Sequence, residues 1–229
     1  MALRELVDRR VEPPARAWFA RASAAAGGEA DRGALHEAFT SATRRLGRVR
    51  RVASEDEIAR LAAAGVSWPV GDWAADELGR AALLVGAAGR LPGAELERFV
   101  DECYRQGDGA ERQAILRSLP LLPAPERFLE IGVDACRSHI QPLFEAIACE
   151  NPYPSRHFPE LNFNQMVLKA LFTGVALARI MLLDDRVTPE LGRMAADFAS
   201  ERRAAGRSVP PDIGQLTEER LTDPRGDRP

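Results

Sequence analysis

The chain has 229 residues and a mass of 25.0 kDa, the size of one large domain or two small ones, with one favoured. It is 45% hydrophobic and 28% charged, a composition that excludes disordered, collagen-like and coiled-coil chains. The net charge of −3, from 31 basic and 34 acidic residues, gives no overall field that would attract nucleic acid. Residues 4–10 include the charged Arg4, Glu5, Asp8, Arg9 and Arg10, and no apolar core follows them. We therefore expect no signal peptide and a cytoplasmic protein.

Cysteine and histidine patterns do not indicate a metal centre. The three cysteines have no CxxC spacing and lie in apolar helical surroundings: Cys103, Cys136 and Cys149. Buried, unbridged thiols are therefore expected. The three histidines are far apart and lack HxxxH spacing: His36, His139 and His157. The sequence also lacks GxSxG, P-loop and GxGxxG motifs. We expect no cofactor, no metal and no catalytic constellation.

In the first ninety residues the apolar positions recur at helical spacing, and no stretch alternates as a strand would. Helices are predicted from Pro13-Pro14, over 32–46, after Ser54 and over 72–86. Ser54 and Glu57 have the spacing of a capping box, and Asp72 is the predicted N-cap of its helix.

From residue 90 onward, helices of medium length alternate with short turns. They are predicted over 92–105, 111–119 with Asp108 as cap, 127–137, 142–149, 163–172 and from Thr188-Pro189. The apolar stretch 166–183 contains Lys169 and Arg179, so we expect a buried helix pair rather than a membrane span. The predicted fold is all-α, with stacked helical hairpins resembling a short HEAT-like solenoid; the alternative is a compact irregular helical bundle. A single helical domain over 1–216 and a disordered tail over 217–229 are expected.

The most distinctive polar segment is the connector 150–161. Its three prolines predict an extended, stiff chain, which leads into the helix 163–172 with Asn162 as N-cap and Gln165 completing a capping box. Asn162, Gln165 and Lys169, the sole lysine, lie three and four residues apart and so share one helix face. The face could receive an anion or a partner, or could serve folding alone. The predicted ligand- or partner-binding residues are Asn151, Tyr153, Arg156, His157, Glu160, Asn162, Asn164, Gln165 and Lys169.

Two charge clusters have a simpler interpretation. Asp184-Asp185 resembles half of the magnesium clamp of isoprenoid synthases, but a carboxylate one turn further on is missing, so we interpret the pair as an acidic loop before Thr188. A basic cluster lacks the interleaved aromatic residues typical of nucleic-acid binding. It comprises Arg44, Arg45, Arg48, Arg50 and Arg51. We expect no nucleic-acid partner.

Three segments resemble the EboA-domain family: 73–84, 151–172 with its Asn-Pro-Tyr-Pro and Phe-Pro-Glu-Leu-Asn-Phe-Asn-Gln sequences, and 201–212. The resemblance implies a protein of bacterial and algal gene clusters. These clusters also encode a prenyltransferase-like membrane protein, a dehydroquinate-synthase-like cyclase and other enzymes, and are tied to making or moving a cyclitol or prenyl-linked metabolite. It implies no agreed activity and no catalytic residues.

Two functions are therefore carried forward. The first is a non-enzymatic scaffold or adaptor that contacts pathway enzymes or the prenyltransferase-like membrane protein through residues 151–169. The second is a small-molecule binding protein or enzyme acting on a phosphorylated or prenylated intermediate. In it, Lys169 and Arg156 would hold an anion, Asn164 and Gln165 would orient polar groups, and His157 or Glu160 would carry protons. An enclosed pocket favours the second function, and an exposed patch favours the first.

Overall fold

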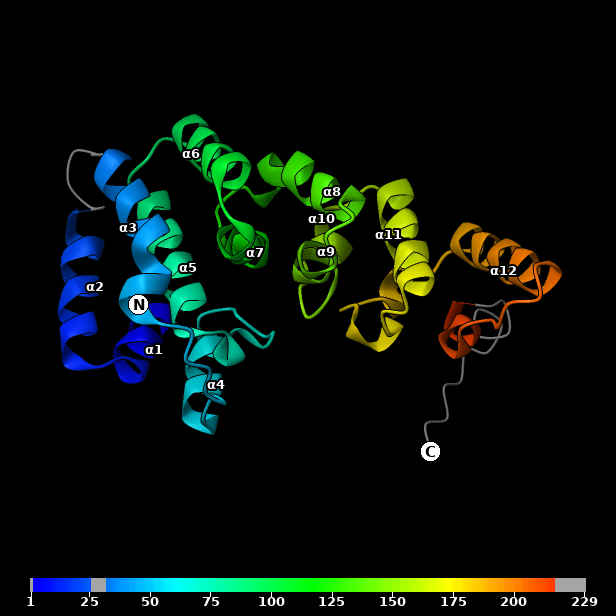
Figure 1. The fold of residues 1–229 in the computed structure, drawn as a ribbon, viewed down its shortest axis with the longest axis horizontal. Helices are drawn as coiled ribbons and strands as arrows, with labels where there is room; N and C mark the ends of the chain where they lie inside the picture. Colours follow the sequence, from blue (N-terminus) through cyan, green and yellow to red (C-terminus); the bar gives the residue numbers. More distant parts are fainter. Residues whose placement is uncertain (1, 26–31, 217–229) are drawn as a thin grey trace. The chain divides into compact units, whose positions relative to one another are not determined.

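The computed structural model describes residues 2–25 and 32–216, and every regular element within these ranges is a helix (Figure 1). The predicted all-α class is confirmed. The chain divides into two compact units, Met1–Ile147 and Ala148–Pro229, which are described separately. The single domain over 1–216 and the HEAT-like stacking stay predictions, and the predicted tail 217–229 lies outside the described residues. Among the described helices, none combines the length and apolar character needed to cross a bilayer.

The first unit is arranged around α5 (Ala75–Ala88), which packs against α1, α3 and α7 (Figure 1). All residues from 73 to 81 are buried. The other elements of this unit are α1 (Ala2–Arg10), α2 (Pro13–Ala25), α3 (Arg32–Leu46), α4 (Glu55–Ala63), η1 (Val70–Asp72), α6 (Gly93–Gln106), α7 (Gly109–Ser118), η2 (Leu119–Leu121), η3 (Pro125–Phe128), α8 (Leu129–Arg137) and, up to Ile147, α9 (Gln141–Ala148). The sequence thus places its longest run of buried positions at the centre of the unit.

Two predicted helix caps in this unit are confirmed and one is wrong. The Ser54 hydroxyl accepts a hydrogen bond from the Glu57 N–H, and Asp108 accepts from the first-turn N–H groups of α7. Asp72 instead ends η1, and α5 begins after Ala74, whose N–H donates to the Glu77 carboxylate at 2.8 Å. The helix starts later than predicted because a 3-10 turn uses residues 70–72, and the buried Glu77 satisfies the free Ala74 N–H at the start of α5 from within the helix.

A buried arginine joins α5 to α3. Arg80 is 1% exposed. Its Nη1 donates to Asp76 Oδ2 at 3.1 Å, its Nη2 to the Thr43 hydroxyl at 3.0 Å and its Nε to the Phe39 carbonyl at 3.0 Å. Thr43 donates in turn to Asp76 at 2.7 Å. The guanidinium therefore keeps enough partners to offset the loss of water around a buried charge.

The same network continues to α7. Arg117 of α7 donates to Glu77 Oε1, and Glu111 lies with one carboxylate oxygen 3.9 Å from Arg80. The other oxygen of Glu111 accepts from the Asp108 N–H at 2.9 Å, completing the α7 cap. Three helices of the first unit are thus connected through charged groups at their shared boundary.

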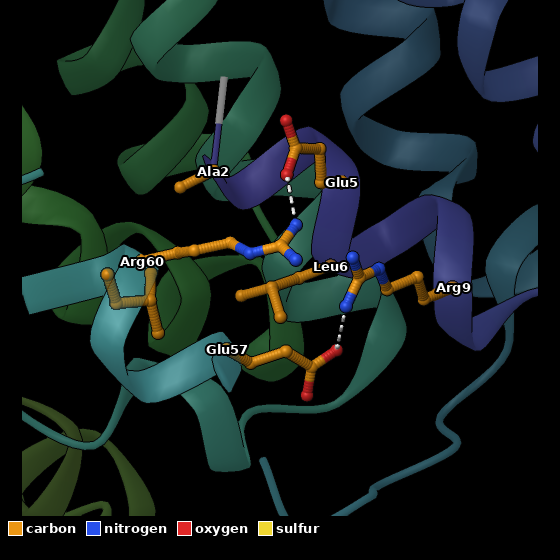
Figure 2. Close-up of a pocket in the computed structure, with 7 residues that line it drawn as sticks. Ala2, Glu5, Leu6, Arg9, Glu57 and Arg60 are labelled. Atoms are coloured by element: carbon orange, nitrogen blue, oxygen red, sulfur yellow. Dashed lines mark hydrogen bonds and ion pairs between the residues drawn. The ribbon is translucent and has the colours of Figure 1, made fainter. Parts of the chain in front are cut away.

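Helices α1 and α4 are joined by charge pairs at the surface (Figure 2). Arg60 Nη1 lies 3.3 Å from Glu5 Oε2, and Arg9 Nη1 lies 3.8 Å from Glu57 Oε1. The hollow between these side chains measures about 10 Å³, which is room for a single water molecule. The hollow lies at the contact between α1 and α4 and is too small for a ligand.

The second unit contains α10 (Tyr153–His157), α11 (Glu160–Thr173), η4 (Leu177–Arg179), η5 (Asp184–Arg186), α12 (Pro189–Ala204) and η6 (Pro211–Leu216). The predicted start of α12 is confirmed, because the Thr188 hydroxyl accepts from the Leu191 N–H at 3.2 Å. The helix pair predicted over 166–183 is wrong. Gly174 ends α11 with a φ of +75°, a conformation that glycine adopts at little cost, and only short 3-10 turns follow.

The buried network gives a test of stability. Replacing Arg80 by Met should lower the free energy of unfolding by about 3 kcal/mol or more, because Asp76 keeps its charge and loses its counter-ion. Trp18, Trp68 and Trp73 all lie in the first unit, so tryptophan fluorescence during urea unfolding reports on it.

The matched control is Arg193→Met, which removes an exposed arginine from a surface pair in α12, and this change should leave the fluorescence transition unmoved. The double variant Asp76→Asn/Arg80→Met should recover part of the loss, because residue 76 then no longer carries a buried charge without its counter-ion. An Arg80→Met protein as stable as the wild type would contradict the role given to this network.

Candidate functional site

The connector before α11 is folded, so the prediction of an extended segment is wrong. Residues 153–157 form the short helix α10, with Pro154 in its first turn. A proline is well accommodated there because that N–H has no helical partner to lose. The Asn151 side chain accepts from the Tyr153 N–H at 3.0 Å, which turns the chain into α10. The prolines limit the backbone, but the local Asn turn decides its direction.

The predicted Asn162 cap is also wrong. Helix α11 begins at Glu160 after Pro159, and no side chain caps its first turn. The Phe163 N–H already donates to the Pro159 carbonyl at 3.0 Å, which places Asn162 inside the helix. Pro159 has the backbone conformation of a helix boundary, so the helix starts three residues earlier than the Asn-x-x-Gln pattern predicts.

The structure distributes the nine predicted residues over three environments. Asn151, Tyr153 and Asn164 are buried; His157, Asn162 and Lys169 are half-buried; Arg156, Glu160 and Gln165 are exposed. Helix α11 contains Asn162, Gln165 and Lys169, which were predicted to share one face. Gln165 is exposed, and the other two are half-buried. Asn164 lies on the opposite, buried side of the helix with Phe163 and Val167. The nine residues therefore do not all converge on one enclosed space.

The buried members contribute to local packing. The ring of Tyr153 lies 5.0 Å from that of His157 and 6.1 Å from that of Phe158, the latter edge-on. Asn164 is 1% exposed, and within the described residues its Oδ1 has no hydrogen-bond partner. This orphaned amide oxygen is a cost to folding and the one polar atom of the predicted set left unpaired in the core of this unit.

An arginine that the sequence analysis did not single out connects α10 to α11. Arg186, from η5, donates through Nη1 to the Ser155 carbonyl at 2.5 Å and through Nη2 to the Phe158 carbonyl at 2.9 Å. Its guanidinium lies 4.5 Å from the centre of the Phe163 ring. The sequence signal for this contact was an arginine directly after Asp184-Asp185, but the interpretation of the segment as an acidic loop gave that arginine no role. This one side chain therefore links α10, the residue that follows it and the first turn of α11.

An ion pair closes the turn before α10. Arg179 donates through Nε and Nη2 to the two carboxylate oxygens of Glu150 at 2.8 and 2.9 Å, and its carbonyl accepts from the Glu150 N–H at 2.8 Å. Glu150 has a φ of +50°, which is unfavourable for a residue with a side chain. The bidentate pair and the backbone bond offset that cost.

One side of α11 exposes large apolar side chains. Leu161 is 62% exposed and Phe172 is 68% exposed, Gln165 is exposed and Leu168 half-buried. The spacings of four, three and four residues place these four residues on one face, which we call the α11 stripe. Asn162 and Lys169 follow along its edge. The sequence signal was present, because apolar positions 161, 168 and 172 fall outside the packing side of the predicted helix.

Other groups that often carry chemistry lie in the first unit. An open hollow of about 250 Å³ there is lined largely by charged side chains, among them the ion pairs Arg105–Asp101 and Arg127–Glu97, and by none of the nine predicted residues. Burial, with the nearby Glu111 charge, raises the pKa of the Cys103 thiol to about 12, so this cysteine stays protonated at neutral pH. Within the described ranges, no three His, Cys, Asp or Glu side chains are grouped as a metal site.

Together these features define an all-helical protein whose second unit presents a mixed apolar and polar helix surface. The comparison with protein families matches residues 1–218 to the family described as metabolite traffic protein EboA. The chain belongs to the EboA family, which confirms the resemblance carried by its sequence segments. Comparisons with curated proteins and with solved structures gave no match.

The Arg186 contacts predict local stability in the second unit. Arg186→Ala removes two charged hydrogen bonds and a cation–π contact, and should destabilise the α10–α11 junction by about 2 kcal/mol. Hydrogen exchange followed by mass spectrometry should show faster exchange in peptides covering 153–163 and unchanged exchange in α5.

The control is Arg203→Ala, which removes an exposed arginine of α12 and should leave both regions unchanged. Equal protection of 153–163 in the Arg186→Ala and wild-type proteins would show that the junction does not depend on this side chain.

Proposed function

We propose that the protein is a non-enzymatic adaptor of a metabolite pathway and that it binds a pathway protein through the α11 stripe. The observation that carries this proposal is the exposure of Leu161 and Phe172 on one face of the helix that holds the most distinctive motif of the chain. Exposed large apolar side chains at regular helical spacing are typical of a protein contact, because each gains about 2 kcal/mol when it is buried.

The composition of the surface supports a protein partner. An aromatic and an aliphatic side chain at the two ends of the stripe would act as anchors, and an aromatic anchor is common where binding energy concentrates. Gln165 lies between them, and Lys169 and Asn162 flank the row, as polar groups do around the apolar centre of an interface. A partner helix with an apolar face and an acidic side chain opposite Lys169 fits this pattern.

The family membership supports a partner that acts in the same pathway. A protein of metabolite traffic belongs with the enzymes or membrane proteins of one pathway, and we propose the prenyltransferase-like membrane protein or a pathway enzyme that makes a cyclitol or prenyl-linked compound. The proposed role is to bring such proteins together, with no bond made or broken by this chain.

The second candidate is a small-molecule site at the same residues. It is supported by the buried, unpaired Oδ1 of Asn164, which could accept a hydrogen bond from a ligand, and by the cationic groups of Arg156 and Lys169 nearby in the sequence. Against it, Asn164 lies on the buried side of α11 and Gln165 on the exposed side, so a small ligand would not reach both amides from one position.

The stripe predicts a loss of partner binding on charge insertion. Leu161→Glu/Phe172→Glu should reduce co-purification with the co-expressed prenyltransferase-like protein or pathway cyclase at least about tenfold, because two anchors would be buried as carboxylates. Both positions are exposed, so the variant should keep the wild-type helical content and melting temperature.

The control is Ile140→Glu, which places one such carboxylate at an exposed apolar position of the first unit and should co-purify normally. Equal recovery of the partner with the double variant, or no recovery with the wild-type protein from any co-expression, would reject the adaptor site.

A thermal-shift series separates the two candidates. For the adaptor, millimolar sugar phosphates and prenyl diphosphates should move the melting temperature by no more than about 1 °C, since nothing binds the folded state preferentially. A stabilisation of several degrees with one of these compounds that is lost in Lys169→Met would favour the small-molecule site instead.

A further inference from the structure

The last turn of α3 and the segment that follows it carry a dense positive charge at the surface of the first unit. Residues 44–52 contain five arginines and no acidic residue, and all five are exposed. We call this segment the arginine loop. Arg44 and Arg45 form no ion pair within the described residues, and Arg48 and Arg50 reach only long contacts of 3.8 and 3.5 Å to acids of α5.

Two valines of the arginine loop project among these charges. Val49 is 51% exposed and Val52 is 89% exposed. Val52 is thus one of the most water-exposed large apolar side chains described in the chain, and it follows directly after Arg50-Arg51. A branched apolar side chain exposed to this extent gains nothing from its position in the folded monomer.

The arginine loop has no regular structure beyond Leu46, where α3 ends, but hydrogen bonds hold its backbone in place. The Gly47 and Val49 carbonyls accept from the N–H groups of Asp76 and Ala75 at 3.1 and 3.0 Å, so the loop covers the start of α5. Further along, Arg51 donates to the Arg9 carbonyl at 3.2 Å. The arginines and valines are therefore presented in a set order, with little ordering left to occur on binding.

Nearby acids do not cancel the charge of the arginine loop. Glu55, Asp56 and Glu57 begin α4 just after it. Asp56 and Glu57 already pair with Arg9, and Asp56 also pairs with Arg60 at 2.6 Å, and Glu55 alone cannot balance five arginines. Glu57 additionally accepts from the Ser54 N–H. The positive charge thus remains concentrated in the arginine loop, although the whole chain has a net charge of −3.

We propose that the arginine loop docks the protein on the surface of an anionic lipid bilayer. The arginines would bind lipid phosphates and the negative surface potential, and the side chains of Val49 and Val52 would enter the boundary between headgroups and acyl chains. This combination of clustered cations with apolar tips matches a membrane surface, which offers both chemistries within a few ångströms. The loop lies in the first unit and does not depend on the α11 stripe.

A nucleic acid is the competing occupant and fits less well. Its phosphates would satisfy the arginines, but an apolar tip gains nothing from a phosphate backbone, and the loop has no aromatic side chain to stack on bases. The acidic balance of the chain also opposes nonspecific binding to a polyanion of that size.

The test is co-sedimentation of the full chain with vesicles of phosphatidylcholine alone or containing about 30% phosphatidylglycerol. We expect binding to the anionic vesicles only, weakened at high salt. Arg44→Glu/Arg45→Glu should reduce binding more than about tenfold, and Val49→Ser/Val52→Ser should reduce it severalfold. Arg48 and Arg50 are left unchanged because they contact Asp76 and Glu77.

The matched control is Arg203→Glu/Arg207→Glu, which makes the same change of net charge at exposed positions of the second unit and should bind as the wild type does. No sedimentation with anionic vesicles, or equal sedimentation of the Arg44/Arg45 variant, overturns the proposal. So does tighter binding to a short DNA duplex that is unaffected by the valine changes, because the loop would then be a nucleic-acid site.

Discussion

The first unit depends on the burial of one guanidinium. Without its partners, the charged Arg80 side chain would lie unpaired in an apolar interior. Helix α3 must therefore place Phe39 and Thr43, and α5 must place Asp76, within hydrogen-bond distance of it. A buried ion pair of this kind adds little net stability compared with a well-packed apolar core, but removing one member is costly. Its effect is therefore to select one arrangement of α3 on α5 over others that would bury similar apolar area.

The local parts of the fold could be predicted from sequence. Helix α3 has the predicted bounds of 32–46, and the caps at Ser54, Asp108 and Thr188 form as their spacing indicates. These features depend on neighbouring residues alone. Asp72 failed as a cap because it lies in the 3-10 turn 70–72, and the N-terminal end of α5 is satisfied instead by Glu77, which accepts from the Ala74 N–H three residues earlier. The importance of Arg80 and Arg186 depends on carbonyls far along the chain, which periodicity does not reveal.

The candidate site could be predicted only where it depends on local spacing, as with the helix caps. Helical spacing correctly puts Asn162, Gln165 and Lys169 along one helix, because that needs only the period of the helix. Which side of α11 is buried is decided by the packing of Phe163 and Val167 and by Arg186 over the Phe163 ring. Asn164 is buried for that reason, and Leu161 and Phe172 are exposed. Asn164 was predicted as a ligand- or partner-binding residue, and the tertiary packing of α11 buries it.

The contacts of Arg48 and Arg50 would allow the proposed binding of an anion to the arginine loop without disturbing the buried network beneath it. Each contacts an acid of α5, but neither acid relies on it. Asp76 keeps Arg80 and the Thr43 hydroxyl, and Glu77 keeps Arg117 and the Ala74 N–H. A lipid phosphate that drew the two exposed arginines away would break only contacts of 3.5 and 3.8 Å that are weak in water. The backbone bonds from α5 to Gly47 and Val49 would remain, so the arginine loop would keep its conformation while its side chains changed partners.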